Sequence, residues 1–143
     1  MFHGLNSHLG HGAHLAHYFS LHGLTTVGFD HRGFGRSEGH GGYVDGIESH
    51  ISDTKKFLSI VLPLYLNTPK FALGLSMGGM TAYKLTLKDP KLFDGKILMA
   101  PDLKNNIGGG LVLATKILGT ILPDKMKLSK PIYGRASKNP AIT

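Results

Sequence analysis

The stretch KFALGLSMGG at residues 70–79 decides the fold. Its first six residues are mostly apolar, which favours a buried β-strand, and a helical pattern follows from Gly78 to Lys88. Between them lies Gly74-Leu75-Ser76-Met77-Gly78, a G-x-S-x-G pattern in which the glycines allow a sharp turn from strand to helix. Such a turn projects the serine hydroxyl from the carboxyl end of a strand, so the stretch predicts Ser76 as a nucleophile.

The G-x-S-x-G pattern is weak evidence by itself, because this glycine-rich chain contains it twice. The second copy, Gly35-Arg36-Ser37-Glu38-Gly39, lies inside a long glycine-rich loop from Asp30 to Gly42, with no strand directly before it and no helix directly after it. We therefore predict that Ser37 fixes the loop through its hydroxyl, and that Ser76 alone has the strand–turn–helix setting.

Strand-like and helix-like segments alternate along the chain, which predicts an α/β fold with a parallel sheet and helices on its faces. The expected strands and helices are, in turn, residues 24–29, 70–75 and 96–99, and residues 13–22, 45–62 and 78–88. Asp45 and Glu48 form a capping-box pattern at the start of the second helix. In such sheets ligands bind at the carboxyl ends of the strands, where Ser76 falls.

A serine nucleophile needs two hydrogen-bond donors for the oxyanion of the tetrahedral intermediate. The backbone N–H of Met77, directly after the serine, is the first predicted donor. The loop that begins His3-Gly4-Leu5 offers the second, which we assign to the N–H of Leu5. An ordinary glycine turn is the alternative interpretation of that loop.

Three segments together resemble the monoglyceride lipase and lysophospholipase group, in the serine-aminopeptidase-like branch of the α/β-hydrolases. They are residues 3–8 (HGLNSH), 30–39 (DHRGFGRSEG) and 74–79 (GLSMGG), in the order and spacing of that group. The resemblance implies a partial α/β-hydrolase fold, with residues 1–105 as an incomplete core segment and residues 106–143 as the start of a cap. It also implies hydrolysis of carboxylic esters of monoacyl lipids without a cofactor. Leu75 departs from the histidine that many relatives carry, which we expect to change packing but not chemistry.

The resemblance further marks residues that support the motifs. His3 is interpreted as a loop-organising residue and not as a base, because it precedes the oxyanion donor. Asp30 and Arg32 are expected to pin the long loop through hydrogen bonds and an ion pair, with a role as active-site charges as the alternative. The supporting set is His3, Gly4, Gly74, Gly78, Gly79, Asp30 and Arg32.

The general base and the acid of a catalytic triad are not identified in this sequence. Hydrolases of this fold place the acid and then the histidine after the serine, yet all nine histidines precede Ser76. In the family a strand also lies between the strands expected at 24–29 and 70–75, and only Met1 and Phe2 remain of it. We expect a chain truncated at both ends. A catalytically dead pseudoenzyme and a fold completed by a partner chain are the alternatives, and a thioesterase, acyltransferase or peptidase on the same fold stays open.

Composition narrows the other classes of function. The net charge of +7 is scattered and shows no basic stripe interleaved with aromatic residues, so nucleic acid is not an expected partner. The absence of cysteine excludes a disulfide scaffold and fits a cytoplasmic location. Histidines at 8, 11, 14 and 17 rotate around a helix and do not converge on a metal, so no metal is expected. The apolar segment 111–122 is expected to be a buried helix, or a cap helix that covers an acyl groove or makes peripheral contact with a membrane.

Overall fold

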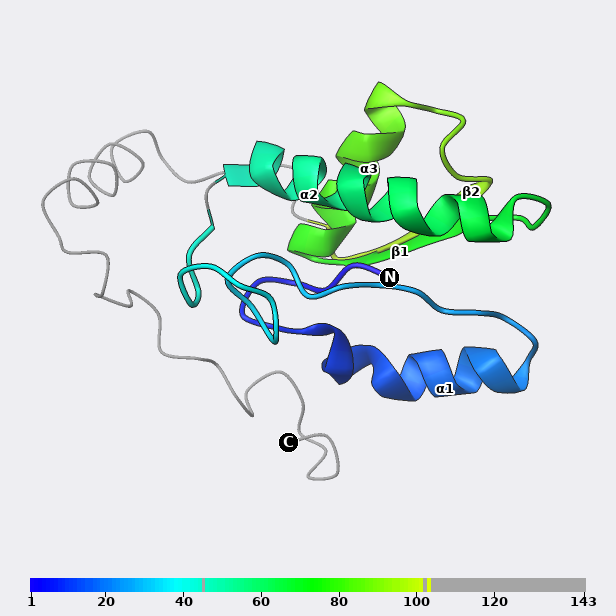
Figure 1. Cartoon of the computed structure of the whole chain (residues 1–143), viewed down its shortest axis with the longest axis horizontal. Helices are drawn as coiled ribbons and strands as arrows, with labels where there is room; N and C mark the ends of the chain where they lie inside the picture. The colour runs from blue at the N-terminus through cyan, green and yellow to red at the C-terminus, as the bar shows by residue number, and fades with distance from the viewer. Residues whose placement is uncertain (45, 102, 104–143) are drawn as a thin grey trace, which may run out of the picture. The chain divides into compact units, whose positions relative to one another are not determined.

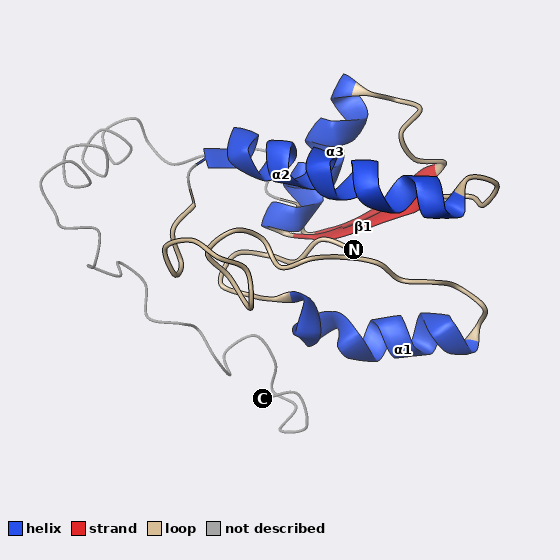
Figure 2. Cartoon of the chain, viewed as in Figure 1, coloured by secondary structure: helices blue, strands red, loops and turns tan. Residues whose placement is uncertain are grey.

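A computed structural model describes residues 1–44, 46–101 and 103 (Figure 1). Within this part, helices and strands alternate as the sequence predicts (Figure 2). The elements, in chain order, are the 3-10 turn η1 (Leu9–Gly12), α1 (Ala13–Leu21), α2 (Gly46–Val61), the 3-10 turn η2 (Leu62–Tyr65), β1 (Phe71–Leu75), α3 (Met77–Lys88) and β2 (Gly95–Met99). The predicted helix ends lie within one residue of these bounds, and the 3-10 turn η2 that follows α2 was not predicted.

β1 and β2 pair in parallel, and α3 connects them. The register sets Leu73 opposite Ile97 and Leu75 opposite Met99. α3 packs on both strands and α2 packs on α3, on one side of the sheet, whereas α1 lies on the other side (Figure 1). This arrangement confirms the predicted α/β class with a short parallel sheet and flanking helices.

The first two residues lie where the resemblance places a central strand. Phe2 forms a parallel bridge with Gly74: its N–H donates to Leu73 O at 2.8 Å, and its carbonyl accepts from Leu75 N–H at 3.1 Å. On the opposite side, the Met1 ammonium group donates to Val27 O at 2.6 Å. Residues 1–2 therefore separate β1 from the segment around Val27.

The prediction of a strand at residues 24–29 is wrong for this structure. The segment runs alongside the first residues (Figure 1) but is not assigned as a strand. A strand requires a ladder of hydrogen bonds, and here the Met1–Val27 hydrogen bond is a single rung, because the neighbouring segment is only two residues long on that side. β-branched residues alone do not make a strand without a partner.

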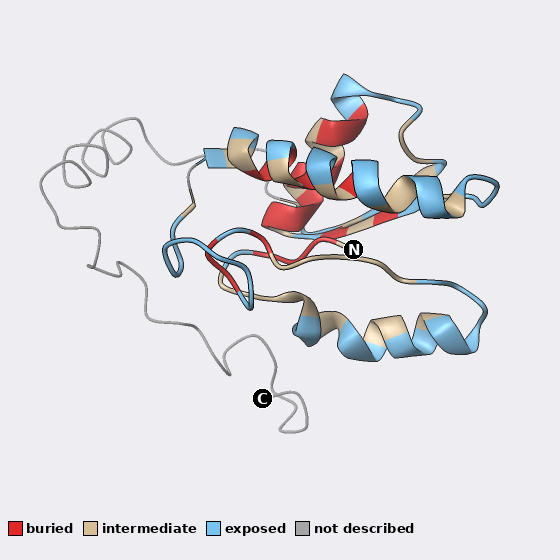
Figure 3. Ribbon diagram, viewed as in Figure 1, coloured by how far each residue is buried: buried red, intermediate tan, exposed pale blue. Residues whose placement is uncertain are grey.

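The prediction of a buried strand at residues 70–75 is confirmed for the strand, but its burial holds on one face only, because burial alternates along β1. Ala72 and Gly74 face α3 and are buried, whereas Phe71 and Leu75 are exposed. On β2, Ile97, opposite Leu73, and Met99, opposite Leu75, are exposed as well. α1, on this side, does not contact β1 or β2, and Leu73 is half-buried, so burial is concentrated on the side of α3 (Figure 3).

The core consists of two clusters that meet at Phe93. One contains Phe2, Ala72 and Ala82, which pack where α3 crosses the sheet. The other contains Ile51, Leu58 and Leu85, which join α2 to α3. Both clusters hold α3, and thereby its first residue, Met77, in a fixed place relative to the strand that precedes it.

Some predictions fall outside the described residues. They are the capping residue Asp45, the apolar segment 111–122 and the expected cap from residue 106 onward. Within the described part of the chain, no helix is long and apolar enough to cross a membrane.

Candidate active site

Ser76 occupies a strained turn between β1 and α3. Its φ of 50° and ψ of −115° lie in a region that side-chain-bearing residues rarely adopt. The turn is held from both sides, because Ser76 N–H donates to Met99 O at 2.8 Å and Ser76 O accepts from Met80 N–H at 3.0 Å. The Ser76 hydroxyl makes no capping hydrogen bond to α3. This is the geometry expected of a nucleophile elbow.

The two glycines of the elbow are required by close backbone contacts. A Cβ atom at Gly74 would lie 2.4 Å from Gly78 O, and one at Gly78 would lie 2.2 Å from Phe2 O and 2.6 Å from His3 O. Gly79 is less constrained, since its Cβ would meet Gly74 O at 3.1 Å. The pattern G-x-S-x-G is thus sterically enforced at residues 74–78.

The loop that begins at His3 lies against the elbow. A Cβ built on Gly4 would be 3.4 Å from both Leu75 O and Ser76 Cβ, so Gly4 packs directly on the candidate nucleophile. Asn6, two residues after Gly4, has a φ of 53°, which marks a tight turn. Leu5 N–H and Met77 N–H form no backbone hydrogen bond within the described residues, and Met77 is the first residue of α3, where helix N–H groups have no intrahelical acceptor. Neither predicted oxyanion donor is thus engaged in such a backbone hydrogen bond in this part of the chain.

His3 connects this loop to the long loop that follows Phe29. Its Nε2 accepts a hydrogen bond from His31 N–H at 2.8 Å, and its Nδ1 lies 2.8 Å from Gly4 O. Only the neutral tautomer with the proton on Nδ1 satisfies both contacts. Because both ring nitrogens are engaged, His3 is not available as the base for Ser76, in agreement with a loop-organising role.

Asp30 anchors the long loop through its carboxylate. Oδ1 accepts from Leu9 N–H at 2.7 Å and Oδ2 accepts from Arg36 N–H at 2.8 Å. Burial by itself would raise the pKa of Asp30, but the hydrogen bonds from Leu9 and Arg36 outweigh it and hold this pKa below its usual range. Arg32 pairs with Asp53 of α2, with Nη2–Oδ1 and Nε–Oδ2 distances of 2.7 and 3.0 Å. Sequence patterns gave no signal for Asp53, because its partner lies 21 positions away.

We expect the substitution Asp30→Asn to destabilise the protein by about 2 kcal/mol, because an amide offers one acceptor oxygen where two N–H donors converge. A thermal unfolding experiment on the whole protein at pH 7.5 measures the effect. Glu38→Gln is the matched control: it removes the same charge from an exposed position of the same loop, and we expect a change within about 0.5 kcal/mol. Equal effects of the two substitutions would contradict the anchoring role of Asp30.

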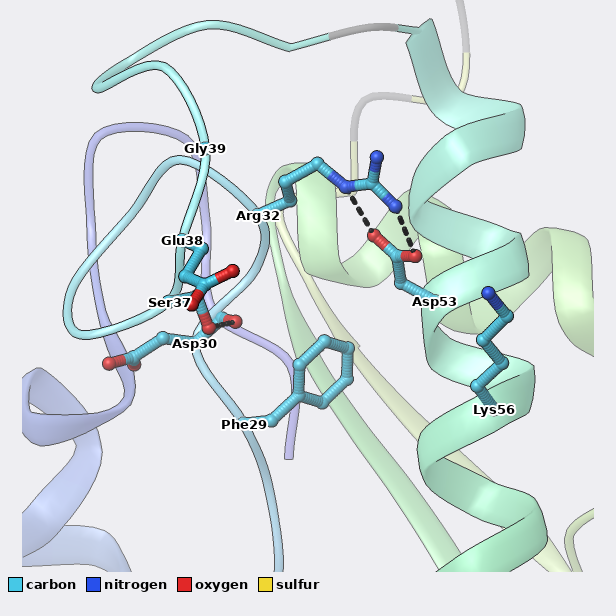
Figure 4. Close-up of a pocket in the computed structure, with 8 residues that line it drawn as sticks. All are labelled: Phe29, Asp30, Arg32, Ser37, Glu38, Gly39, Asp53 and Lys56. Carbon is cyan, nitrogen blue, oxygen red and sulfur yellow. Dashed lines mark hydrogen bonds and ion pairs between the residues drawn. The ribbon is translucent and has the colours of Figure 1, made fainter.

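A cavity of about 490 Å³ lies between the long loop and α2 (Figure 4). Ser76 is not among the residues that line it, which are Phe29, Asp30, Arg32, Ser37, Glu38, Gly39, Asp53 and Lys56. The lining residues include Ser37, the serine of the second G-x-S-x-G pattern, whose hydroxyl donates to the carbonyl oxygen of Asp30. The Ser37 hydroxyl is thus used within the loop, and the cavity is distinct from the elbow.

Comparison with known proteins identifies the family to which this chain is related. The profile of the family described as "Serine aminopeptidase, S33" matches residues 1–141. The chain is 29% identical to a monoacylglycerol lipase of Mycolicibacterium smegmatis, over 85% of this chain and 44% of that protein. It is 30% identical to the mouse (Mus musculus) monoglyceride lipase, over 85% of this chain and 41% of that protein.

A solved structure agrees with these sequence matches. The crystal structure of Paleococcus ferrophilus monoacylglycerol lipase superposes with a TM-score of 0.69 at 26% identity, covering 85% of this chain and 46% of that one. The chain thus spans less than half the length of these relatives. The matched fold is the α/β-hydrolase fold, of which the described residues form a part, as the sequence resemblance predicts. The chain belongs to the serine aminopeptidase S33 family.

Proposed function

We propose that Ser76 is the nucleophile of a hydrolase that cleaves carboxylic esters of monoacyl lipids, with Leu5 and Met77 N–H as its oxyanion hole. The observation that carries this proposal is the strained conformation of Ser76, with Gly4 packed against it. The names of the relatives, monoacylglycerol and monoglyceride lipases, supply the substrate class.

The chemistry follows from these positions. Ser76 Oγ forms a bond to the acyl carbonyl carbon and gives its proton to a base, while the carbonyl electron pair moves onto the oxygen. Leu5 and Met77 N–H donate to that oxyanion, and the N-terminus of α3 adds a positive dipole. Collapse expels the alcohol, which takes the proton, and water then releases the fatty acid.

The proposal assigns the base to a histidine from outside residues 1–143. Every histidine of this sequence precedes Ser76, and both ring nitrogens of His3 are engaged. The relatives are more than twice as long as the aligned part of this chain, so such a residue has room in a longer protein. Peripheral membrane contact through residues 111–122 and a cytoplasmic location belong to the same proposal.

A substrate panel with the endogenous protein tests the reaction class. We expect release of fatty acid from a monoacylglycerol or a lysophospholipid at a kcat/KM at least roughly tenfold above that for an acyl thioester or a peptide substrate, since specificity is the ratio of these constants. Faster cleavage of the thioester or the peptide would overturn the substrate assignment. Binding of a monoacyl lipid without any turnover would favour the non-catalytic alternative.

A further inference from the structure

Three buried histidines from separate segments lie in contact at the loop that begins at His3, called here the oxyanion loop. They are His3, His31 and His50, called here the histidine stack, and they are 6%, 0% and 3% exposed. The ring centroids of His3 and His31 are 4.4 Å apart, and those of His31 and His50 are 4.9 Å apart. His31, from the long loop, thus lies between the oxyanion loop and α2.

Within the stack, His3 is linked to the predicted oxyanion donor, Leu5 N–H, through a single peptide group. His3 Nδ1–H holds Gly4 O at 2.8 Å, and Gly4 O shares a planar trans peptide with Leu5 N–H. Fixing the carbonyl therefore fixes the direction of the N–H. The opposite ring nitrogen, Nε2, must stay unprotonated because it accepts from His31 N–H.

The other two rings are poorly placed to carry a proton. Within the described residues, neither ring nitrogen of His31 has a hydrogen-bond partner, and Nδ1 of His50 has none. The charged groups nearest to them are Asp30 in the long loop and Asp53 in α2, and Arg32 is bonded to Asp53. Burial, aided by His3 and His50, lowers the pKa of His31 to about 3. Burial also lowers the pKa of His3 and of His50, so all three rings are neutral at pH 7.

We propose that His31 is a positioning residue for the Leu5 donor: its neutral ring, packed between His3 and His50, keeps His3 bonded to Gly4, and acid releases the loop. The inference rests on the proposed role of Leu5 in the oxyanion hole. The direction of the pH dependence follows from the difference in proton binding between the packed and the released loop. The released loop binds protons with an ordinary histidine pKa of about 6.5, whereas the packed loop does not, so release is favoured as the pH falls below that value.

Hydrogen exchange of the peptide that covers residues 3–9, followed by mass spectrometry between pH 8 and pH 5, measures the release without requiring catalysis. Each histidine that takes up a proton on release raises the population of the released loop roughly 16-fold from pH 6.5 to pH 5, because a released histidine is already half protonated at pH 6.5. His31→Phe keeps an aromatic ring in the stack and removes one of the groups that can take up a proton. After correction for intrinsic exchange, we expect the protection of wild type to fall about 16-fold further than that of His31→Phe over this range.

His17→Phe, at an exposed position of α1, is the matched control and should follow wild type. Equal pH slopes for wild type and His31→Phe would overturn the proposal. If His31→Phe does not fold at pH 8, the wild-type profile alone decides, because protection that is independent of pH between 6.5 and 5 contradicts proton uptake on release. Asp30 contributes little to this slope, since its pKa is held below its usual range in the packed loop and the ordinary aspartate pKa of about 3.9 lies below pH 5.

Labelling of Ser76 by a fluorophosphonate at pH 8 separates this inference from the proposed function. If Ser76 is not labelled but the loop is still released at low pH, the proposed function is refuted and the role of the histidine stack in loop release stands. If Ser76 is labelled and the protection of the loop is independent of pH, the proposed function is supported and the role of the stack is refuted.

Discussion

Replacement of Ser76 by alanine is expected to lower ester hydrolysis by the whole protein roughly 10⁴- to 10⁶-fold, because the nucleophile and its base act as a unit. The side chain is lost without a change in fold: Ser76 is held by backbone hydrogen bonds to Met99 and Met80, which alanine retains. The initial rate of fatty-acid release from a monoacylglycerol measures the effect.

Ser37→Ala is the matched control for this substitution, because Ser37 occupies the same position in the second G-x-S-x-G pattern. It removes one hydrogen bond to Asp30 O, so we expect a loss of stability of about 1 kcal/mol and an unchanged rate. A Ser76→Ala variant that keeps more than a few per cent of the wild-type rate would remove Ser76 from the mechanism.

Gly78→Ala is expected to produce the largest loss of stability. The added methyl group would lie 2.2 Å from Phe2 O and 2.6 Å from His3 O, both of them backbone atoms that do not turn aside as a side chain would. Alanine is favoured over glycine in a helix by about 1 kcal/mol, but the clash costs about 3 kcal/mol or more, so destabilisation wins. The displaced atoms belong to the strand and loop that carry Leu5, so the oxyanion hole is disturbed as well.

Thermal unfolding of the whole protein tests this prediction, with an expected decrease in Tm of roughly 10 °C or more. Gly41→Ala is the matched control, because a Cβ at this exposed position meets no atom within 4 Å. We expect Gly41→Ala to leave Tm within about 2 °C of wild type. A Gly78→Ala protein as stable as Gly41→Ala would show that the elbow does not pack against Phe2 and His3 as described.

The elbow could be predicted from sequence because its signal is local. Strand, serine turn and helix follow one another within residues 70–88, and each glycine of the motif has a steric reason within a few ångströms. The packing of the loop at Gly4 against Ser76 is a contact between distant positions, and it was indicated by the need for a second oxyanion donor and by the resemblance to a known family, not by a local pattern. α3, whose apolar pattern faces both strands, was likewise predictable from residues 78–88.

The errors arose where structure depends on partners far along the chain. The segment 24–29 has the composition of a strand, but among the described residues only Met1 pairs with it as a neighbouring strand would, through one hydrogen bond to Val27. β1 is exposed at Phe71 and Leu75 because α1, on that side, does not contact the strand. The Arg32–Asp53 pair and the contact of His31 with His50 join the long loop to α2, and no local pattern marks such pairs.

The most direct test of the central claim is the location of a fluorophosphonate adduct in the endogenous protein. Trypsin separates the two candidate serines, because Ser76 falls in the peptide from Phe71 to Lys84 and Ser37 falls in the peptide from Ser37 to Lys55. We predict that the mass increase of the phosphonyl group is found on the peptide 71–84 and localises to Ser76. An adduct on the peptide 37–55, or a protein that hydrolyses monoacylglycerol while the peptide 71–84 stays unmodified, would contradict the assignment of Ser76 as the nucleophile.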